Sequence, residues 1–577
     1  MTETAPADLR AHTIADLAFV SADRFGDEPA LQYRAGDGWE QQTFAELGND
    51  VHDLALGLVA NVEPGERVCI LGETRPEWTR AGLAVLAAGA VVVPIYATSS
   101  REECAWVIED SGARLVICEN AAAAARIASL EVSVRIVTME PVDGYDSLAD
   151  LAVVGREADP AELHRRRAAV QADDIAVIIY TSGTTGRAKG CVLTHRNWLR
   201  IGELTEEMNI VRRADVVYLF LPLAHVFAQM TQFACVSIGA TLVFWGGDVS
   251  RIVPELAEVR PTFLPSVPRI FEKVHAAVTA SLDPAVVQQA VAVGLQVRAL
   301  RQRGEPVPAE LAAGFEQLEP LFGRVQAVFG GRLRQALSGA APIAKEVVEF
   351  FHAAGVPVLE GYGLTETTGV GTVNTITDFR PGSVGRATPG VELRLADDGE
   401  IEMRGPHVFA GYWNNASATA ETIADGWIRT GDLGALDADG FVTITGRKKD
   451  IIVTAGGKNI SPANLENDLR QSPWISHAVV YGDRRPYPVA LITLDPDTVP
   501  AWAAAQGVEV SSDAVRSLIS GVVDAVNDRY SKASQLKRFA ILPDDLSVES
   551  GELTPSLKIK RRVVSEHHAD VIESLYT

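Results

Sequence analysis

An apolar run that ends in a loop rich in glycine and hydroxyl groups is the feature that most constrains this chain. Ile175–Ile179 contains only Ile, Ala and Val, which is typical of a strand buried in a sheet. The next segment, Tyr180–Lys189 (YTSGTTGRAK), combines two glycines with Ser and Thr hydroxyls and two cations. Glycines let backbone N–H groups approach a ligand closely, and a nearby cation favours an anion. The pattern predicts a polyphosphate site at the end of a strand.

The same loop has a second interpretation. It is not a Walker A sequence, because Lys189 stands three residues after Gly186 and is followed by Gly190. Stretches of Ser, Thr and Gly also form ordinary surface loops. The loop alone therefore does not decide between a phosphate site and a plain connection.

Five other short motifs follow this loop along the chain. They are Ser338–Ile343 (SGAAPI), Gly361–Thr367 (GYGLTET), Thr430–Asp432 (TGD), Gly446–Asp450 (GRKKD) and Leu553–Arg562 (LTPSLKIKRR). Together with the loop, and in this order, they resemble the signature motifs of the adenylate-forming superfamily, which includes acyl-CoA synthetases, luciferases and nonribosomal peptide adenylation domains. The resemblance covers nearly the whole chain. It implies an enzyme that joins a carboxylic acid to AMP, using ATP, before a thiol displaces the AMP.

Composition limits the partners and the compartment. The 577 residues include 52 basic and 75 acidic side chains, for a net charge of −23, which argues against a nucleic-acid partner. The five cysteines lie far apart without a C-x-x-C pair, so neither a disulfide framework nor a zinc site is expected. The first ten residues show no signal-peptide pattern. We expect a cytoplasmic enzyme.

The uncharged segment Ala81–Ser100 has the composition of a membrane span, but it contains glycines and a proline. We interpret it as a helix over Ala81–Ala88, a stop at Gly89 and a strand over Val91–Ile95. Peripheral contact with a membrane stays open, since long-chain acids reside in bilayers. A homodimer stays open as well.

The order of strand and helix patterns predicts an α/β fold. Runs such as Arg67–Leu71 and Val91–Ile95 alternate with alanine-rich helical stretches, which indicates mainly parallel sheets covered by helices. We expect residues 1–445 to form a large N-terminal adenylation domain that binds ATP and the acyl chain. Residues 446–450 are expected to be a hinge, and residues 451–577 a small mobile α+β lid domain.

Residues 284–331 interrupt the N-terminal domain with a predicted helical insertion. Its helical patterns cover Val286–Arg303, Ala309–Leu318 and Leu321–Phe329. This insertion, and the preceding Val267–Lys273 (VPRIFEK), look like the long-chain branch of the acyl-CoA synthetases. The resemblance therefore implies a long-chain fatty acid, or a related carboxylic acid, as the substrate.

The resemblance assigns a nucleotide site to the first motifs. Glu366, with Thr184, is expected to hold Mg²⁺; Tyr362 is expected to stack on adenine and Thr365 to contact the α-phosphate. Without the resemblance, SGAAPI would be an ordinary small-residue turn and Glu366 a surface residue of a turn. The other residues expected to bind the nucleotide are Thr181, Ser182, Gly183, Thr185, Gly186, Lys189, Gly339, Ala340, Ala341, Glu360, Gly361 and Gly363.

Asp432 and Arg447 are expected to bind the ribose hydroxyls of ATP. An aspartate after a glycine is more often a turn residue, as Asp437–Gly440 (DADG) illustrates. The order and spacing of the motifs, rather than the residue type, support this assignment.

Lys558 is the expected catalytic lysine. In the family, a lysine near the C-terminus reaches the carboxylate and the α-phosphate when the small domain closes. The usual pattern has a glycine directly before it, whereas Leu557 stands here, so Lys560 is a rival and spacing favours Lys558. Without the resemblance, a solvated basic tail would be the default interpretation.

Lys449 matches the hinge position, where a backbone rotation turns the small domain between the two half-reactions. After that rotation, the resemblance implies that Gly456, Gly457 and Lys458 face the site and line the path of coenzyme A. A tight β-turn is the competing account of this glycine pair.

His225, in Leu221–Phe227 (LPLAHVF), matches a family histidine near the carboxylate pocket. A lone histidine among apolar residues is more often structural, and a carboxylate needs no base at neutral pH. We therefore expect His225 to gate the acyl pocket. Gln229 follows where some long-chain relatives have an aromatic gate.

The leading hypothesis is an AMP-forming long-chain fatty acid–CoA ligase that uses ATP, Mg²⁺ and coenzyme A. One alternative keeps the adenylation but loads a carrier-protein phosphopantetheine, as fatty acyl-AMP ligases do. Others are a medium-chain or aryl acid–CoA ligase, a luciferase-like oxidative enzyme, and a degenerate nucleotide-binding protein.

Overall fold

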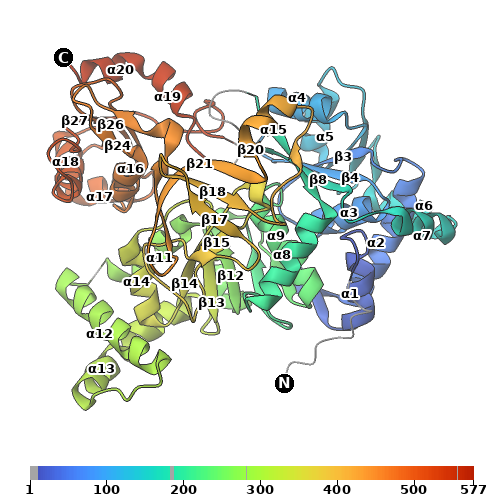
Figure 1. Cartoon of the computed structure of the whole chain (residues 1–577), viewed down its shortest axis with the longest axis horizontal. Coiled ribbons are helices and arrows are strands. Elements are labelled where there is room, and N and C mark those ends of the chain that lie inside the picture. The colour runs from blue at the N-terminus through green and yellow to red at the C-terminus, as the bar shows by residue number, and fades with distance from the viewer. Residues whose placement is uncertain (1–10, 182–186, 281, 555–556) are drawn as a thin grey trace.

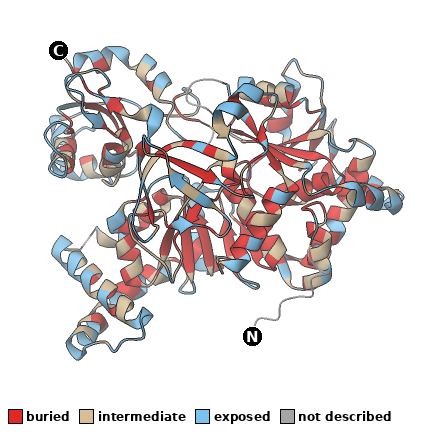
Figure 2. Cartoon of the chain, in the orientation of Figure 1, coloured by how far each residue is buried: buried red, intermediate tan, exposed pale blue. Residues whose placement is uncertain are grey.

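The computed structural model describes residues 11–181, 187–280, 282–554 and 557–577. It has a mixed α/β fold with a large N-terminal domain and a smaller C-terminal domain, which confirms the predicted fold class (Figure 1). In Figure 1 the C-terminal domain is the orange-to-red lobe that contains helices α16 (Pro462–Arg470) and α20 (Ala569–Ser574). Figure 2 shows buried residues concentrated in the sheets of both domains.

An eight-stranded sheet carries the strand that precedes the predicted phosphate loop. Its strands are β3 (Arg67–Leu71), β4 (Val91–Ile95), β5 (Leu115–Cys118), β6 (Arg135–Thr138), β7 (Asp146–Ser147), β8 (Ile175–Thr181), β9 (Lys189–Thr194) and β19 (Gly411–Tyr412). Their order is β19-β9-β8-β4-β3-β5-β6-β7. Strands β3 to β7 are parallel, and β8 is parallel to β4, whereas β9 and β19 run antiparallel to their neighbours.

The helices around this sheet connect and cover its strands. They are α1 (Leu17–Phe25), α2 (Phe44–Val59), α3 (Pro76–Ala87), α4 (Arg101–Ser111), α5 (Ala121–Ala128), α6 (Leu148–Glu157) and α7 (Pro160–Ala169). The uncharged segment 81–100 contains the end of α3, the whole of β4 and, between them, Gly89 with a φ of 77°. The predicted helix, stop and strand of this segment are confirmed, and the helix and the strand are both buried in the domain core.

A nine-stranded sheet forms the other half of the N-terminal core. Its strands are β1 (Pro29–Ala35), β2 (Gly38–Thr43), β10 (Val216–Leu219), β11 (Thr241–Phe244), β12 (Phe263–Ser266), β13 (Gln335–Ser338), β14 (Val358–Tyr362), β15 (Thr372–Val373) and β16 (Arg386–Ala387). Their order is β16-β15-β14-β13-β12-β10-β11-β1-β2. From β14 to β1 the pairs are parallel, so the carboxyl ends of β12, β13 and β14 meet at one edge.

Two helices, α8 (His195–Glu207) and α9 (Val226–Ile238), pack against each other in the core that the two sheets share. Trp198 of α8 and Phe233 of α9 are buried, with ring centroids 5.0 Å apart. Helix α9 is apolar on nearly all sides and ends at Gly239 in a left-handed conformation. Its first turn lies at the predicted site, because His225 is its N-cap.

The predicted helical insertion is present as α12 (Pro284–Gln302) and α13 (Ala309–Val328), which project from the domain (Figure 1). The prediction of two helices within residues 309–329 is wrong, because α13 continues through Pro320. Proline removes one intrahelical hydrogen bond. Burial of Phe315 before it, and of Leu321 and Phe322 after it, keeps the helix continuous.

Other helices complete this part of the domain. They are α10 (Ile252–Val259), α11 (Pro268–Thr279), which contains most of the VPRIFEK segment, and α14 (Lys345–Ala354). Helix α12 packs on α14. Among the described residues no single helix is long and apolar enough to cross a membrane; the α11–α12 pair, bent by 118°, passes that test by length and composition only.

A small sheet precedes the link to the C-terminal domain. It contains β17 (Glu392–Leu395), β18 (Glu400–Arg404), β20 (Ile423–Ala424), β21 (Trp427–Leu436) and β22 (Val442–Arg447), with α15 (Ala416–Thr422) beside it. A short 3-10 turn over Lys448–Asp450 follows β22 directly.

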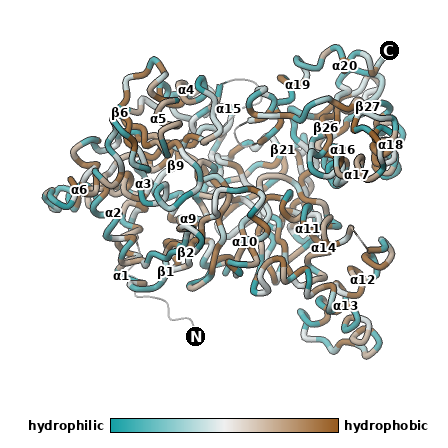
Figure 3. Tube along the Cα trace, turned by 180° about the vertical axis from the view of Figure 1, so that it is seen from behind, coloured by the Kyte–Doolittle hydropathy of each residue, from teal (hydrophilic) through white to brown (hydrophobic). Residues whose placement is uncertain are grey.

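The C-terminal domain consists of two small sheets and helices. Its strands are β23 (Ile452–Val453), β24 (Asn459–Ile460), β25 (Ile475–Tyr481), β26 (Val489–Leu494) and β27 (Arg538–Ile541). Besides α16 and α20, its helices are α17 (Thr498–Gln506), α18 (Asp513–Asn527) and α19 (Arg561–His567). Two buried apolar clusters lie on either side of the β25–β26–β27 sheet, so this domain has a core of its own (Figure 3).

Candidate active site

Three predicted ribose- and adenine-binding residues lie together at the edge of the nine-stranded sheet. The Tyr362 hydroxyl donates a hydrogen bond of 2.7 Å to Asp432 Oδ2. Arg447 faces Asp432 across the antiparallel pair β21–β22, with Nε 3.5 Å from Oδ1. Burial raises the pKa of Asp432, and the positive charge of Arg447 opposes that shift. The carboxylate thus lies ready to accept hydrogen bonds from a polar ligand.

Glu366, the predicted metal-binding residue, lies in a short 3-10 turn after β14. The Tyr412 hydroxyl donates a hydrogen bond of 2.7 Å to its Oε1 atom. Cys191 lies next to the same carboxylate, because β19 pairs with β9 and places Tyr412 opposite Cys191. Burial, and then the charge of Glu366, raise the pKa of the Cys191 thiol, so this cysteine is a neutral neighbour.

The sequence analysis did not predict a role for Tyr412 or Cys191. Their position depends on the pairing of β19 with β9, strands that are more than two hundred residues apart in the sequence. The local sequence Phe409–Trp413 (FAGYW) carries no signal of its own for such a contact. Only a long-range pairing identifies these residues as neighbours of Glu366.

Lys558 reaches this site from the C-terminal domain. Its loop is closed by a bridge between Leu553 and Ile559, and Thr554 N–H donates to the Lys558 carbonyl at 2.7 Å. Lys558 keeps exposed surface, yet desolvation by the surrounding protein lowers the pKa of its side chain, and the charge of Arg447 adds to the shift. The charges of Glu366 and Asp432 oppose it.

The rival lysine, Lys560, lies elsewhere. Its Nζ atom is 3.3 Å from Oε1 of Glu103, at the start of α4. Leu557, which replaces the usual glycine, has a φ of 60° and is 65% exposed. This left-handed conformation is the physical reason for a glycine at that position, because a Cβ atom disfavours it.

Positive side chains gather around these residues. Burial lowers the pKa of Lys449, and the charges of Arg447 and Lys189 lower it further. Arg447 acts on Lys558 in the same way. A polyphosphate placed here would relieve this mutual repulsion, which explains how a protein with a net charge of −23 offers a local anion site.

The phosphate loop lies at the end of β8, where Thr181 pairs with Lys189 at the start of β9. Lys189 Nζ is 5.0 Å from the centroid of the Tyr412 ring, which places this end of the loop near Glu366. The predicted residues Ser182, Gly183, Thr184, Thr185 and Gly186 lie outside the described residues.

The SGAAPI and GYG motifs end the parallel strands β13 and β14. Ala340 adopts a φ of 68°, and a Cβ atom at the position of Gly339 would touch the Phe227 ring. Glu360 is buried, and burial raises its pKa to about 8, partly opposed by hydrogen bonds from the backbone of Gly382 and Ile343. The other predicted residues of these motifs, Ala341, Gly361, Gly363 and Thr365, lie in the same segments.

The predicted coenzyme A loop makes no hydrogen bond to Tyr362, Glu366 or Asp432 among the described residues. Gly457, with a φ of 76°, and Lys458 lie in the turn between β23 and β24, with Gly456. In the described ranges, the hydrogen bonds of this loop stay within its own hairpin, apart from one between Ala455 N–H and the Arg485 carbonyl.

An apolar pocket opens beside Tyr362 and Gly339. Helices α8 and α9 contribute to its walls, with Leu204 and Met230 among the lining residues. His225 lies at its rim, where its Nδ1 atom accepts a hydrogen bond from Phe227 N–H. Burial lowers the pKa of His225 to about 3, so the ring is neutral and caps α9.

Gln229 does not line this pocket, and its Nε2 atom donates instead to the Leu223 carbonyl. The residues of α9 that line the pocket are Val226, Phe227, Met230, Thr231 and Ala234. The pocket lining is mainly apolar, as a fatty acid requires, and the hydroxyls of Thr205 and Thr231 donate to carbonyls of their own helices.

The comparisons with known proteins agree with this geometry. The family model described as AMP-binding enzyme matches residues 19–413, and that of the AMP-binding enzyme C-terminal domain matches residues 449–577. This chain belongs to the AMP-binding enzyme family. Among AMP-binding enzymes, the long-chain-fatty-acid–CoA ligase FadD15 of Mycobacterium bovis is 42% identical over 95% of this chain and 95% of its own length. The ligase ACSBG2 of Mus musculus is 32% identical over 98% and 93%.

Solved structures of AMP-binding enzymes share the fold. The adenylation domain of a carboxylate reductase from Mycobacterium chelonae superimposes with a TM-score of 0.80 at 24% identity, covering 98% of this chain and 91% of that chain. The o-succinylbenzoate CoA synthetase of Bacillus subtilis, in complex with its acyl-adenylate, gives 0.70 at 23% identity, covering 95% and 97%.

The Glu366 carboxylate fits a magnesium ion in this AMP-binding enzyme. Magnesium is commonly held by one or two carboxylates together with substrate phosphates and waters. In the described part of the chain no group of three or more His, Cys, Asp and Glu side chains forms a metal site by itself. Glu366 beside the positive cluster is suited to an ion that arrives with the nucleotide.

Proposed function

We propose that this protein is an AMP-forming long-chain fatty acid–CoA ligase. The observation that carries the proposal is the position of Lys558, within electrostatic range of Glu366 and Asp432. The apolar pocket beside Tyr362 supplies a place for the acyl chain. The names of the relatives that are 42% and 32% identical support the same substrate class.

In the first half-reaction, a carboxylate oxygen attacks the α-phosphorus of ATP and pyrophosphate leaves. Both reactants are anions, so positive charge must be placed where the negative charge develops. Lys558 and Arg447 are suited to this task, while Asp432 binds the ribose. Magnesium held by Glu366 would neutralise phosphate charge when it is bound with ATP.

In the second half-reaction, the thiol of coenzyme A attacks the acyl carbon and AMP leaves. We propose that rotation at Lys449 brings Gly456, Gly457 and Lys458 to the site for this step. In the part of the chain that the structure describes, no hydrogen bond joins this loop to Tyr362 in the present orientation, which supports the need for such a movement. Thr184, with the other phosphate-loop residues, belongs to the proposal by resemblance.

A single comparison tests the function and its alternatives. Pyrophosphate release is measured with carboxylic acids of graded chain length and with aryl acids, with and without coenzyme A. We expect acyl-CoA and the highest rates with long chains. Acyl-AMP that accumulates despite coenzyme A would favour the carrier-protein ligase, and a preference for short or aryl acids would identify the other alternative.

We extend the proposal to location and membrane contact. The five cysteines are free thiols and buried, which suits the cytoplasm. A substrate that resides in bilayers favours transient contact with lipid. Cell fractionation and flotation with phospholipid vesicles test these two points.

A further inference from the structure

The VPRIFEK segment contributes no side chain to the site described above, yet it lies next to it. Strand β12 ends at Ser266, which pairs with Ser338 of β13, and α11 begins two residues later. The N-terminal turn of α11 therefore lies at the sheet edge that holds the nucleotide motifs. Arg269 and Glu272 are three residues apart on this helix and share one face.

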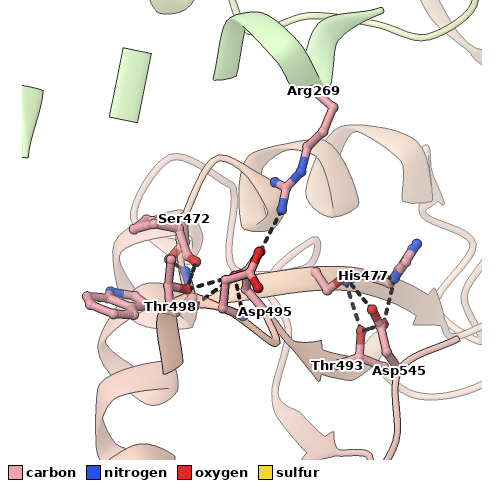
Figure 4. Close-up of polar contacts among 11 residues, drawn as sticks. Arg269, Ser472, His477, Thr493, Asp495, Thr498 and Asp545 are labelled. Atoms are coloured by element: carbon pink, nitrogen blue, oxygen red, sulfur yellow. Dashed lines mark hydrogen bonds and ion pairs between the residues drawn. The ribbon is translucent and has the colours of Figure 1, made fainter. Parts of the chain in front are cut away.

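Arg269 contacts the C-terminal domain directly. Its Nη2 atom donates a hydrogen bond of 2.8 Å to Asp495 Oδ2, just after the end of β26 (Figure 4). The Asp495 side chain is only 7% exposed and that of Arg269 is 28% exposed. This ion pair is thus largely removed from water, where charge-assisted hydrogen bonds are stronger than at the surface.

The Asp495 carboxylate is fixed by its own domain. Its Oδ1 atom accepts hydrogen bonds of 3.0 Å from both the backbone N–H and the hydroxyl of Thr498 (Figure 4). The two oxygens therefore have separate roles, since Oδ1 caps the turn before α17 and Oδ2 receives Arg269. A rigid acceptor of this kind defines one position for the incoming guanidinium.

Other residues of opposite charge face each other across the same interface. Burial raises the pKa of Glu272, and the positive charges of Arg470 and Arg269 counteract that shift. At the edge of the contact, Arg529, just after the end of α18, pairs with Glu346 of α14 at 3.3 Å. Opposite charges thus face each other from the N-terminal and C-terminal domains at three places.

These residues do not serve the stability of α11 itself. A cation at Arg269 is unfavourable near the positive end of a helix dipole. Glu272 Oε2 is buried without a hydrogen-bond partner in the described residues, which also costs free energy. Arg269 finds its acceptor, Asp495, in the C-terminal domain, and the charge of Arg470 from that domain partly compensates the buried Glu272; a polar interface of this kind suits reversible docking.

We propose that Arg269 is a positioning residue that acts through Asp495. The pair holds the C-terminal domain in the orientation that places Lys558 beside Glu366 and Asp432. The inference rests on the proposed function, because it concerns the step that joins the acid to AMP. It assigns to the VPRIFEK segment a role in seating the domain rather than in binding the acyl chain.

The test separates the two half-reactions in Arg269→Gln, Asp495→Asn and the double variant. Asn keeps one oxygen for Thr498 but puts an NH2 group in place of the Oδ2 acceptor, so it removes both the charge and the hydrogen bond to Arg269. We expect acid-dependent ATP–pyrophosphate exchange to fall about tenfold in each single variant, which corresponds to about 1.4 kcal/mol. The double variant should be no slower than the slower single variant, because the same contact is lost. Thioester formation from supplied acyl-AMP should be unchanged, and Arg269→Lys should restore part of the exchange.

A matched control and a second readout complete the test. Arg196→Gln breaks the surface pair with Asp173, at 2.6 Å within the N-terminal domain, and should alter neither half-reaction. Hydrogen exchange of the α11 amides should accelerate in the Arg269 and Asp495 variants but not in the control. This readout needs no catalysis, so it distinguishes failure of the inference from an absence of adenylation in the unaltered protein.

Three results would overturn the inference. They are an equal loss in both half-reactions, effects that multiply in the double variant, and exchange at α11 that does not change. If Arg269→Gln does not fold, Asp495→Asn and Arg269→Lys carry the same comparison.

Discussion

The Tyr412 hydroxyl donates a hydrogen bond of 2.7 Å to Glu366 Oε1 and so positions this carboxylate. The tyrosine comes from β19, a short strand at the edge of the eight-stranded sheet, whereas the glutamate follows β14 of the nine-stranded sheet. This hydrogen bond therefore connects the two sheets at the point where the nucleotide is expected. It fixes one carboxylate oxygen and thereby the direction of the other.

Tyr412→Phe should weaken adenylation and its response to magnesium. Losing a hydrogen bond to a charged group costs about 1.5–3 kcal/mol, so acid-dependent pyrophosphate exchange should fall about tenfold or more. The Mg²⁺ concentration for half-maximal exchange should rise. Tyr530→Phe, which removes a 2.6 Å hydrogen bond to Asp468 far from the site, is the control. An unchanged magnesium dependence would contradict the positioning role of Tyr412.

Lys558→Ala and Lys560→Ala distinguish the two candidate lysines. Lys558 lies by Glu366 and Asp432, so its loss should reduce acyl-AMP formation by several orders of magnitude and spare the thioester step from supplied acyl-AMP. Lys560 forms a partly exposed ion pair with Glu103, so Lys560→Ala should reduce acyl-AMP formation less than tenfold. Single-turnover measurements with labelled ATP compare them. A reversed order would transfer the catalytic role to Lys560.

Leu557→Gly should stabilise the lysine loop. The leucine has a φ of 60° and is 65% exposed, so its side chain strains the backbone without packing in return. Relief of about 1–2 kcal/mol is partly offset by the greater freedom of glycine in the unfolded chain. We expect a net gain below about 1 kcal/mol in thermal or urea unfolding of the C-terminal domain. Leu557→Val should instead destabilise the C-terminal domain. Equal effects of Leu557→Gly and Leu557→Val on unfolding would contradict the strain argument.

Glu360 should make stability fall with rising pH. Its pKa of about 8 in the folded chain lies above the ordinary value of 4.5, so the folded state binds more protons between these values. The stability that this proton provides is complete below about pH 4.5 and is lost as pH rises to about 8, by up to about 1.4 kcal/mol per pH unit. Glu360→Gln should flatten this part of the profile, measured by unfolding across pH. A variant with an unchanged slope would contradict the raised pKa.

The strands of the parallel core were predictable because their signals are local. Arg67–Leu71 and Val91–Ile95 are buried on both faces, so each appears as a continuous apolar run, and the structure has both with these bounds. The prediction of separate helices on either side of Pro320 was wrong, because packing of Phe315 and Phe322 outweighs one missing hydrogen bond. Tertiary contacts decided that case, and the local sequence does not contain them.

In the candidate site too, the local sequence predicted some residues and long-range contacts decided others. Asp432 and Arg447 are close in sequence and pair across one hairpin, so motif order was sufficient to place them together. Tyr412, Cys191 and Arg269 were missed because their partners belong to distant strands or to the other domain. Leu557 was recognised as a departure, and only the structure supplies its left-handed backbone.

The separate core of the C-terminal domain has a consequence for heat inactivation. Because Lys558 belongs to a unit with its own apolar clusters, that unit can melt while the parallel sheets and the apolar pocket stay intact. Warming should then abolish turnover before it abolishes fatty-acid uptake. The warmed protein would sequester its substrate without activating it.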